Sequence, residues 1–259
     1  MTIVLVHRLW MTPLGWENWT ERFEKAGHEV LAPTWPGFDR PIEELRAHPE
    51  VMNGLGVEEV TDHYAEIIGA LPEAPVIMGH SFGGLITQKL LSRGLGKAGV
   101  VVHSAPAKGT LGLPFSALKA SFPVLKNPAN VNRAVPLSPK EFHYAFANTL
   151  SFGESEALRE KYAIAAPGRP LWQAATANVS THNATAVDLA KPDRAPLLFL
   201  ASEGDNVVPA SMNRENHRRY RKSPALTEIK EFPNRPHFVM AAPGWEEVAD
   251  YALNWSERF

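Results

Sequence analysis

Short apolar segments alternate with longer amphipathic segments along most of this chain. Each apolar segment spans about five residues and is followed by a turn-forming residue, which is typical of a β-strand. In the longer segments, apolar residues recur three or four positions apart, as Val60, Tyr64 and Ile68 do, and this spacing predicts helices with one buried face. The regular alternation of strands and helices predicts βαβ units and a parallel sheet.

The same pattern gives the expected bounds of these elements. Several of the predicted strands are apolar on both faces, so we expect helices to cover both sides of the sheet. Strands are predicted at residues 2–6, 28–32, 74–78, 99–102, 196–201 and 226–231. Helices are predicted at residues 17–26, 57–71, 82–93, 211–220 and 246–258. The predicted fold class is therefore α/β, with a mostly parallel sheet flanked by helices.

Residues 108–192 interrupt this alternation. They are rich in proline, alanine, asparagine and aromatic residues, and they show helical spacing without a clear strand. We interpret them as an insertion of short helices that forms a lid over the carboxyl edge of the sheet, where open α/β sheets bind their ligands. The predicted organisation is one α/β core, formed by residues 1–107 and 193–259, and a helical lid at residues 108–192.

Composition narrows the classes of function. With 259 residues, 44% of them hydrophobic and 21% charged, the chain is long enough for a globular domain with a large core. The absence of cysteine excludes disulfides, thiol nucleophiles and thiolate metal sites. A formal net charge of −2 gives no general attraction to nucleic acids or anionic membranes. A basic run between Arg214 and Lys222 is interpreted as a solvent-exposed helix face, with a phosphate-binding patch as the alternative.

The apolar runs also bear on where the protein works. The first run is about five residues long and no basic residue precedes it, unlike a secretory signal. Glycine, proline or charged residues interrupt every longer run before about 18 residues, so no transmembrane helix is predicted. We expect a cytoplasmic protein that binds a small-molecule substrate and neither nucleic acid nor membrane. Its oligomeric state is not predicted.

The stretch Gly79-His80-Ser81-Phe82-Gly83 carries the strongest sign of chemistry, because it lies between a predicted buried strand and a predicted helix. A serine in a tight strand-to-helix turn needs small residues two positions before and after it, since its backbone is strained and neighbouring elements pack closely. Gly79 and Gly83 meet this need, and the start of a helix favours negative charge that develops beside Ser81. A plain glycine-rich turn is the alternative, but the flanking strand and helix favour a nucleophile.

A nucleophilic serine requires a histidine base and an acid that orients this histidine. Asp205 lies just after one late predicted strand, and His237 lies just after the next one. The chain order Ser81, Asp205, His237 is the order expected for a serine nucleophile in this architecture. Glu203 is the alternative acid, and Asp205 taken alone would also suit a turn or a helix cap. None of the other nine histidines lies in the loop after the last strand.

These motifs and their order resemble the α/β-hydrolase fold family, and within it the cofactor-free serine esterases and lipases. The resemblance extends over nearly the whole chain, from His7 at the end of the first strand, through residues 79–83 and Asp205, to His237. It implies a mostly parallel sheet with a lid insertion. It also implies an enzyme that needs neither a cofactor nor a metal ion.

The loop after the first strand departs from the family pattern. Family members usually have His-Gly there, whereas here His7 is followed by Arg8. By correspondence with the family, the oxyanion hole is expected to consist of the backbone N–H groups of Leu9 and Phe82. Glycine adopts backbone angles that arginine reaches only at a cost, so Arg8 puts the shape of this loop in question. Its guanidinium has two alternative roles: contact with an anionic substrate group or the oxyanion, or pairing with a carboxylate.

Aromatic and polar residues near the lid are candidate walls of a substrate pocket. Trp10, Trp172 and His182 are expected to contact substrate together with Arg8, although His182 and its neighbour Asn183 would also serve as structural caps. Further aromatic candidates, most of them expected to form the core of the lid, are Phe115, Phe122, Phe142, Phe146 and Phe152. Such a pocket would suit an acyl or aromatic group.

Together these features predict a serine hydrolase that cleaves an ester-like bond (a carboxylic ester, lactone or thioester) of a small apolar or aromatic substrate. Ser81 attacks the carbonyl carbon, His237 transfers the proton and Asp205 orients His237, with an acyl-enzyme as intermediate. A carbon–carbon bond hydrolase, an acyltransferase, a hydroxynitrile-type lyase and a non-catalytic ligand-binding receptor are the alternatives. A serine at the turn argues against dehalogenases and epoxide hydrolases, which have a carboxylate there.

Overall fold

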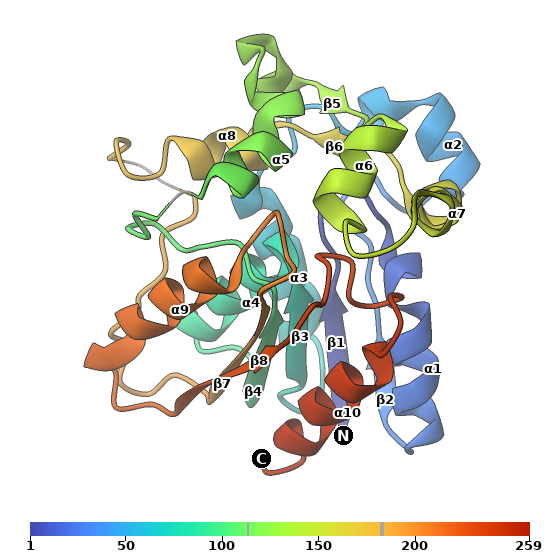
Figure 1. The fold of residues 1–259 in the computed structure, drawn as a ribbon. Helices are drawn as coiled ribbons and strands as arrows, with labels where there is room; N and C mark the ends of the chain where they lie inside the picture. The colour runs from blue at the N-terminus through green and yellow to red at the C-terminus, as the bar shows by residue number, and fades with distance from the viewer. Residues whose placement is uncertain (113, 182–183) are drawn as a thin grey trace.

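The computed structural model describes residues 1–112, 114–181 and 184–259. Six strands form one sheet in the order β2-β1-β3-β4-β7-β8, and all neighbours in it are parallel (Figure 1). Each predicted strand is present, and no bound differs from its predicted position by more than two residues. The strands are β1 (Thr2–Val6), β2 (Glu29–Leu31), β3 (Val76–His80), β4 (Ala98–Val102), β7 (Leu197–Ser202) and β8 (Thr227–Phe232).

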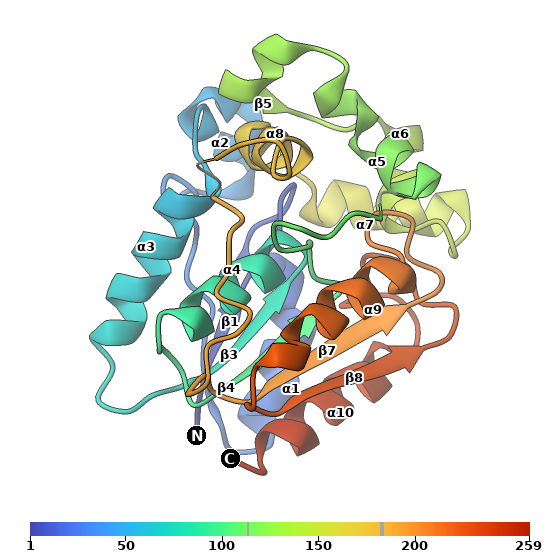
Figure 2. The ribbon, with the colours of Figure 1, turned by 90° about the vertical axis from the view of Figure 1, so that its left-hand side faces the viewer.

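Helices cover both faces of this sheet, which confirms the predicted α/β class. On one face α4 packs against β3 and β4, α9 packs against β7 and β8, and α3 packs on α4 (Figure 2). On the other face α1 contacts β2 and α10, and α10 also contacts β4 (Figure 1). These helices, all within two residues of their predicted bounds, are α1 (Glu17–Lys25), α3 (Val57–Gly69), α4 (Phe82–Ser92), α9 (Ala210–Arg219) and α10 (Trp245–Ser256).

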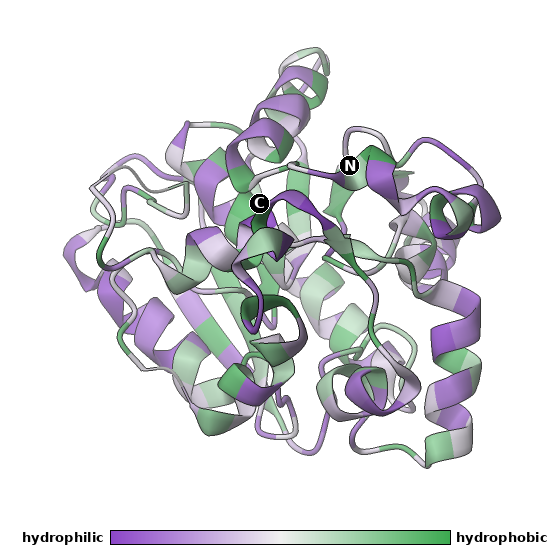
Figure 3. Ribbon diagram, turned by 90° about the horizontal axis from the view of Figure 1, so that it is seen from above, coloured by the Kyte–Doolittle hydropathy of each residue, from purple (hydrophilic) through white to green (hydrophobic). Residues whose placement is uncertain are grey.

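The central strands form the middle of the hydrophobic core. Every residue of β3, β4 and β7 is buried, as are the last four residues of β1, because helices cover both faces of these strands. In the view of Figure 3, hydrophobic segments gather in the middle of the ribbon and hydrophilic segments lie mainly on the outer helices. This close packing fixes where the loops leave the carboxyl ends of the strands.

Helices α5 to α8, between β4 and β7, lie above the carboxyl ends of the strands (Figure 1). Ser138 and Ser151 begin α6 and α7 with capping boxes, in which the serine and a glutamate three residues later bond each other's backbone N–H groups. That this insertion works as a separate lid stays a prediction. The helices are α5 (Phe115–Leu125), α6 (Pro139–Phe146), α7 (Phe152–Tyr162) and α8 (Arg169–Ala175).

Two short features of the structure are absent from the sequence-based prediction. The insertion contains an antiparallel pair, β5 (Ala134–Val135) and β6 (Ala166–Pro167), and α2 (Ile42–Ala47) lies in the first half of the chain. Both are too short for a hydrophobic period to stand out. Single 3-10 turns lie at Pro13–Trp16, Pro49–Met52, Pro128–Asn132 and Tyr220–Lys222. No helix among the described residues has the length and apolar character needed to cross a membrane.

Candidate active site

The chain passes from β3 to α4 through a tight turn at Ser81. The φ angle of Ser81 is 57° and its ψ angle is −119°, a strained conformation for a residue with a side chain. A Cβ atom added to Gly79 would lie 2.0 Å from the carbonyl oxygen of Gly83, and one added to Gly83 would lie 2.1 Å from the carbonyl oxygen of Val6. Both positions therefore require glycine, which is the reason for the spacing seen in the sequence.

Ser81, His237 and Asp205 lie in contact at the carboxyl edge of the sheet. The Ser81 hydroxyl donates to Nε2 of His237 at 3.0 Å, and Nδ1–H of His237 donates to Oδ2 of Asp205 at 2.7 Å. The other carboxylate oxygen, Oδ1, accepts from the backbone N–H groups of Val207 at 2.7 Å and Val208 at 2.9 Å. The structure thus brings together the three residues that the sequence order selects, and it gives Asp205 a fixed orientation.

The alternative acid, Glu203, does not take part in this arrangement. Its side chain is exposed, whereas Asp205 is 1% exposed. Both Asp205 and Glu203 follow β7, but the short turn after this strand directs only Asp205 towards His237. The observed geometry therefore agrees with the first choice of acid.

Charge and burial set the protonation states of this group. Burial lowers the pKa of His237, and the Asp205 carboxylate opposes this shift only in part. Burial alone would raise the pKa of Asp205, but the charges and hydrogen bonds of His237 and His103 outweigh it and hold this pKa well below its usual range. At neutral pH Asp205 is therefore ionised and His237 is a neutral imidazole, which is the form that accepts a proton from a serine.

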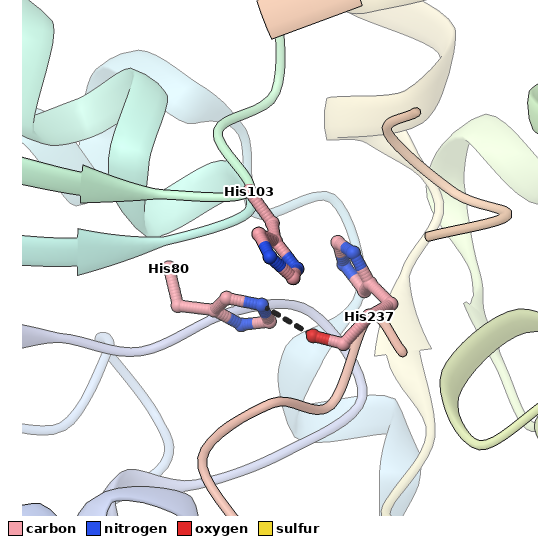
Figure 4. A group of neighbouring side chains, drawn as sticks. All are labelled: His80, His103 and His237. Carbon is pink, nitrogen blue, oxygen red and sulfur yellow. Dashed lines mark hydrogen bonds between the residues drawn. The ribbon is translucent and has the colours of Figure 1, made fainter. Parts of the chain in front are cut away.

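Two further histidines complete a buried histidine cluster formed by His80, His103 and His237 (Figure 4). Nε2–H of His80 donates to the backbone carbonyl of His237 at 2.8 Å. Nδ1 of His103 lies 3.1 Å from Oδ2 of Asp205, the same oxygen that accepts from His237. His103 follows β4 directly and has a φ angle of 47°. Sequence order gave no role to His80 or His103, although both end strands at this edge.

The histidine cluster could in principle hold a metal ion, because it consists of three histidines, each of which has one ring nitrogen within 4.8 Å of those of the other two. Its hydrogen bonds explain the arrangement without an ion. Both ring nitrogens of His237 are engaged with Ser81 and Asp205, and both ring nitrogens of His80 are engaged with Arg8 and the His237 carbonyl. A metal ion would have to break these bonds, so the geometry favours a hydrogen-bonded network.

The loop after β1 lies beside Ser81 and is fixed by His7. Nδ1–H of His7 donates to the carbonyl of Arg8 at 3.0 Å, and Nε2 accepts from the backbone N–H of Trp35 at 3.1 Å. Burial lowers the pKa of His7 to about 3, so its imidazole remains neutral. Within the described ranges, neither the N–H of Leu9 nor that of Phe82 donates a hydrogen bond. Phe82 lines the cavity beside Ser81, whereas Leu9 is buried and does not line it, so the oxyanion hole stays a prediction.

The expected conflict between Arg8 and the loop backbone does not occur. The left-handed residue of this loop is Trp10, with a φ angle of 64°, and Arg8 is not among the described residues with positive φ. Arg8 therefore occupies the position of the usual glycine without the strain that was expected there. Trp10 in turn is held by its indole N–H, which donates to the carbonyl of Val135 at 2.9 Å.

Neither expected role of the Arg8 side chain matches its position. Arg8 is 1% exposed and does not line the cavity at Ser81, so the expectation of a substrate contact is corrected. In the part of the chain that the structure describes, no carboxylate lies within ion-pair distance of Arg8 either. Its guanidinium contacts His80, Met11 and Phe238 instead, beneath the histidine cluster.

A cavity of about 190 Å³ opens beside Ser81, between the sheet edge and the insertion. Trp10 and Trp172 do not line it, because helix α8 directs Leu171 and Ala174 towards the cavity instead of Trp172. His182 and Asn183 lie outside the described residues. The cavity walls, which are mostly small or aliphatic, include Phe82, Ala105, Thr110, Ala117, Leu118, Ser121, Leu125, Leu171, Ala174, Val207, Val208 and Met212.

The aromatic residues of the insertion have other positions. Phe115, Phe122 and Phe152 are exposed on the surface. Phe142 and Phe146 are buried, and the ring of Phe146 lies edge-on to the His237 ring at a centroid distance of 5.3 Å. Phe146 therefore packs against the histidine and not against the cavity. The sequence could not have identified the walls, because small side chains carry no distinct signal.

Comparison with known proteins gives one family and many similar structures. The sequence model of a family described as the alpha/beta hydrolase family matches residues 3–251. No curated protein matches the chain closely enough to count as a relative. The similar structures include polyneuridine aldehyde esterase, with a TM-score of 0.67, 17% identity and 98% of both chains covered.

Two other similar structures come from microorganisms. An extracellular alpha/beta-hydrolase from a Paenibacillus species has a TM-score of 0.71 and 19% identity, with 98% of both chains covered. The monoacylglycerol lipase of Paleococcus ferrophilus has a TM-score of 0.65 and 21% identity, with 98% of this chain and 93% of that chain covered. At identities this low, the structural similarity shows a shared fold and nothing more, so the chemistry has to be argued from the site itself.

Proposed function

This chain belongs to the alpha/beta hydrolase family, and we propose that it is a serine hydrolase that cleaves an ester-like bond of a small apolar or aromatic substrate. The observation that carries this proposal is the hydrogen-bonded series from Ser81 through His237 to Asp205, with Ser81 at the wall of a cavity. Carboxylic esters, thioesters and lactones all present the carbonyl carbon that such a serine attacks. The similar structures that are named as esterases and lipases are in line with this choice.

In the proposed reaction Ser81 Oγ attacks the carbonyl carbon while Nε2 of His237 takes the hydroxyl proton. The carbonyl oxygen becomes an oxyanion, which the backbone N–H groups of Leu9 and Phe82 stabilise. The intermediate then collapses, the bond to the leaving oxygen or sulfur breaks, and His237 gives the proton to the leaving group. A water molecule next attacks the acyl-enzyme, with His237 as base, and this step releases the acid and restores Ser81.

The walls of the cavity support a neutral substrate of limited size. A volume of about 190 Å³ slightly exceeds the roughly 150 Å³ of an engineered apolar cavity that binds benzene. A single ring or a short acyl chain therefore fits. No charged side chain of the described residues lines the cavity, so an ionised acyl group would lose its hydration without gaining a partner.

A panel of activated esters with acyl groups from acetyl to decanoyl, together with a benzoyl ester, tests this proposal. We expect turnover of the short and aromatic esters, and labelling of Ser81 by a fluorophosphonate, mapped by mass spectrometry. Ser81→Ala is the control: it should lower kcat by about 10⁴-fold or more, since the serine, histidine and acid act as one unit.

Other outcomes of the same panel identify the alternatives. Unlabelled Ser81, with activity retained by Ser81→Ala, would reject the proposed nucleophile. Tight binding of a cavity ligand without turnover would favour a receptor. Cyanide release from a cyanohydrin would favour a lyase, and transfer of the acyl group to an added alcohol would favour an acyltransferase.

A further inference from the structure

The most unusual buried group in this protein is the guanidinium of Arg8. Arg8 is 1% exposed, and no acidic side chain of the described residues forms an ion pair with it. Its Nε atom is buried without a hydrogen-bond partner. Burial lowers the pKa of Arg8, yet a guanidinium starts from so high a value that it stays charged at neutral pH. An unpaired buried charge is costly, so its retention next to a catalytic site calls for a reason.

Besides its contact with Met11 in its own loop, Arg8 has two contacts that lead to the loop that carries His237. Nη1 of Arg8 donates to Nδ1 of His80 at 3.0 Å, which leaves the His80 proton on Nε2. From Nε2, His80 donates to the backbone carbonyl of His237 at 2.8 Å (Figure 4). The Arg8 guanidinium also lies over the ring of Phe238, with its central carbon 4.0 Å from the ring centroid. Arg8 thus holds both residues of the His237-Phe238 pair.

Among the described residues, the buried acidic side chain that can balance the charge of Arg8 is Asp205. The three imidazoles of the histidine cluster lie between these two charges. On the side of the insertion, α6 presents the apolar ring of Phe146 to His237, and the Phe146 carbonyl accepts from the backbone N–H of Phe238 at 2.9 Å. The titratable and charged groups that face His237, one from each strand end around it, are Arg8 after β1, His80 at the end of β3, His103 after β4 and Asp205 after β7.

We infer that Arg8 is a positioning residue for His237: it holds the His237 loop through His80 and Phe238, and its charge disfavours protonation of the His237 imidazole. This inference rests on the proposed function only for its effect on turnover. The hydrogen bonds and the ring contact carry it, and the lowered pKa of His237, to which the Arg8 charge contributes, agrees with it.

A consequence for pH dependence follows with a definite sign. His237 acts as a base only while it is neutral, so activity falls as the pH drops through its pKa. The Arg8 charge lowers this pKa and extends activity to lower pH. Loss of that charge should therefore move the acidic limb of the pH profile to higher pH.

Two variants separate the charge of Arg8 from its contacts. Arg8→Met has similar length and an apolar side chain suited to Phe238, but no charge. Arg8→Lys keeps the charge but loses the planar guanidinium over the ring. We expect Arg8→Met to move the acidic limb of kcat/KM for a neutral ester to higher pH by less than about one pH unit, because Arg8 is the smallest of the effects that lower the pKa of His237. Arg8→Lys should keep the wild-type limb and lower kcat alone.

A second measurement does not depend on turnover. In Ser81→Ala protein with isotopically labelled histidine, the His237 imidazole can be titrated by NMR, and Arg8→Met should raise its pKa while Arg8→Lys should not. Arg22→Met is the matched control, since Arg22 pairs with Asp250 on the surface away from the site. Equal losses of activity in both Arg8 variants, with unchanged limb and unchanged titration, would overturn the inference.

The two readouts also distinguish the inference from the proposed function. If no ester is turned over but the titration shifts as expected, the inference holds and the proposed function fails. Arg8→Met removes a buried charge that has no ion-pair partner among the described residues, so its melting temperature should equal or exceed that of the wild type. An unfolded Arg8→Met protein would contradict this expectation, because it would show that the fold requires the contacts of Arg8 with His80 and Phe238.

Discussion

Two regions of different character meet at Ser81. Below it lies the histidine cluster with Asp205 and Arg8, in which each charged or polar side chain is at most 1% exposed and most ring nitrogens have a hydrogen-bond partner. Above it lies a cavity walled by small and aliphatic side chains from the insertion, the loop after β7 and α9. In the proposed function, the first region carries out the reaction, and the second selects the substrate that reaches Ser81.

The two regions also differ in what holds them. The cluster residues come from the ends of adjacent parallel strands, so the backbone of the sheet fixes their spacing. The cavity walls depend on how α5 and α8 pack over that edge, and they include exposed side chains such as Leu111. Changes in the cluster should therefore affect stability and rate for every substrate, whereas changes in the cavity should alter the choice of substrate.

The largest expected effect concerns the cost of keeping histidines neutral. Burial lowers the pKa of His7, His80 and His237, while an unfolded histidine titrates near 6.5. Below this pH these histidines are protonated in the unfolded chain but stay neutral in the folded chain, so the free energy of unfolding falls as the pH falls. A histidine whose folded-state pKa lies well below the measured range contributes about 1.4 kcal/mol per pH unit, so His7 and His80 together give a slope of about 2.7 kcal/mol per unit, to which His237 adds. Urea unfolding between about pH 7 and pH 4.5 measures this slope.

His80→Gln is the matched variant for this measurement. The glutamine amide has a donor and an acceptor, so it can keep the bonds to Arg8 and to the His237 carbonyl without titrating. We expect its slope to be lower than that of the wild type by about 1.4 kcal/mol per pH unit. Stability that is constant from pH 7 to about pH 5 in the wild type would contradict the view that the cluster is held neutral.

The sequence predicts the cluster far better than the cavity. Ser81, Asp205 and His237 each follow a strand that its apolar residues reveal, and parallel strands bring their carboxyl ends to one edge. The glycines at 79 and 83 add a local steric requirement that a sequence shows directly. His80, His103 and Arg8 are the exceptions in this region. Sequence order gave the two histidines no role, and nothing in the sequence tells a buried guanidinium from one that points to substrate.

The cavity escapes prediction for a different reason. Helical spacing predicts short helices in the insertion without giving their bounds, and the face that α8 turns towards Ser81 depends on long-range packing. Trp172 is the conspicuous residue of this helix, while its neighbours Leu171 and Ala174 form the wall. Large aromatic residues attract attention in a sequence, but here Phe142 and Phe146 are buried away from the cavity, while Phe115, Phe122 and Phe152 are exposed.

A pair of substitutions on α8 tests this assignment with an intermediate effect. Ala174→Leu adds three carbon atoms to the cavity wall and should reduce kcat/KM for hexanoyl relative to acetyl esters by at least about 10-fold, the lower end of the range for one methylene group in a hydrophobic pocket. Trp172→Leu should leave this ratio within about twofold of the wild type, because Trp172 lies outside the cavity walls. The ratio is insensitive to partial loss of folded protein. A ratio that changes in Trp172→Leu but not in Ala174→Leu would show that Trp172, and not Ala174, lines the cavity.

The smallest expected effect concerns His103, which shares the Oδ2 atom of Asp205 with His237. His103→Ala removes one polar neighbour of the Asp205 carboxylate, which keeps its hydrogen bonds from the N–H groups of Val207, Val208 and His237. We therefore expect kcat to fall by only about fivefold, the equivalent of about 1 kcal/mol. His103→Asn should stay within about twofold of the wild type, since asparagine tolerates a positive φ angle and can place an N–H near the same oxygen. KM should remain unchanged in both variants, because His103 is not part of the cavity wall. Equal rates for the alanine variant and the wild type would mean that His103 only fills space. If the alanine variant is slower and the asparagine variant is not, the loss comes from the missing polar group or from backbone strain in the alanine variant, and not from the missing ring volume.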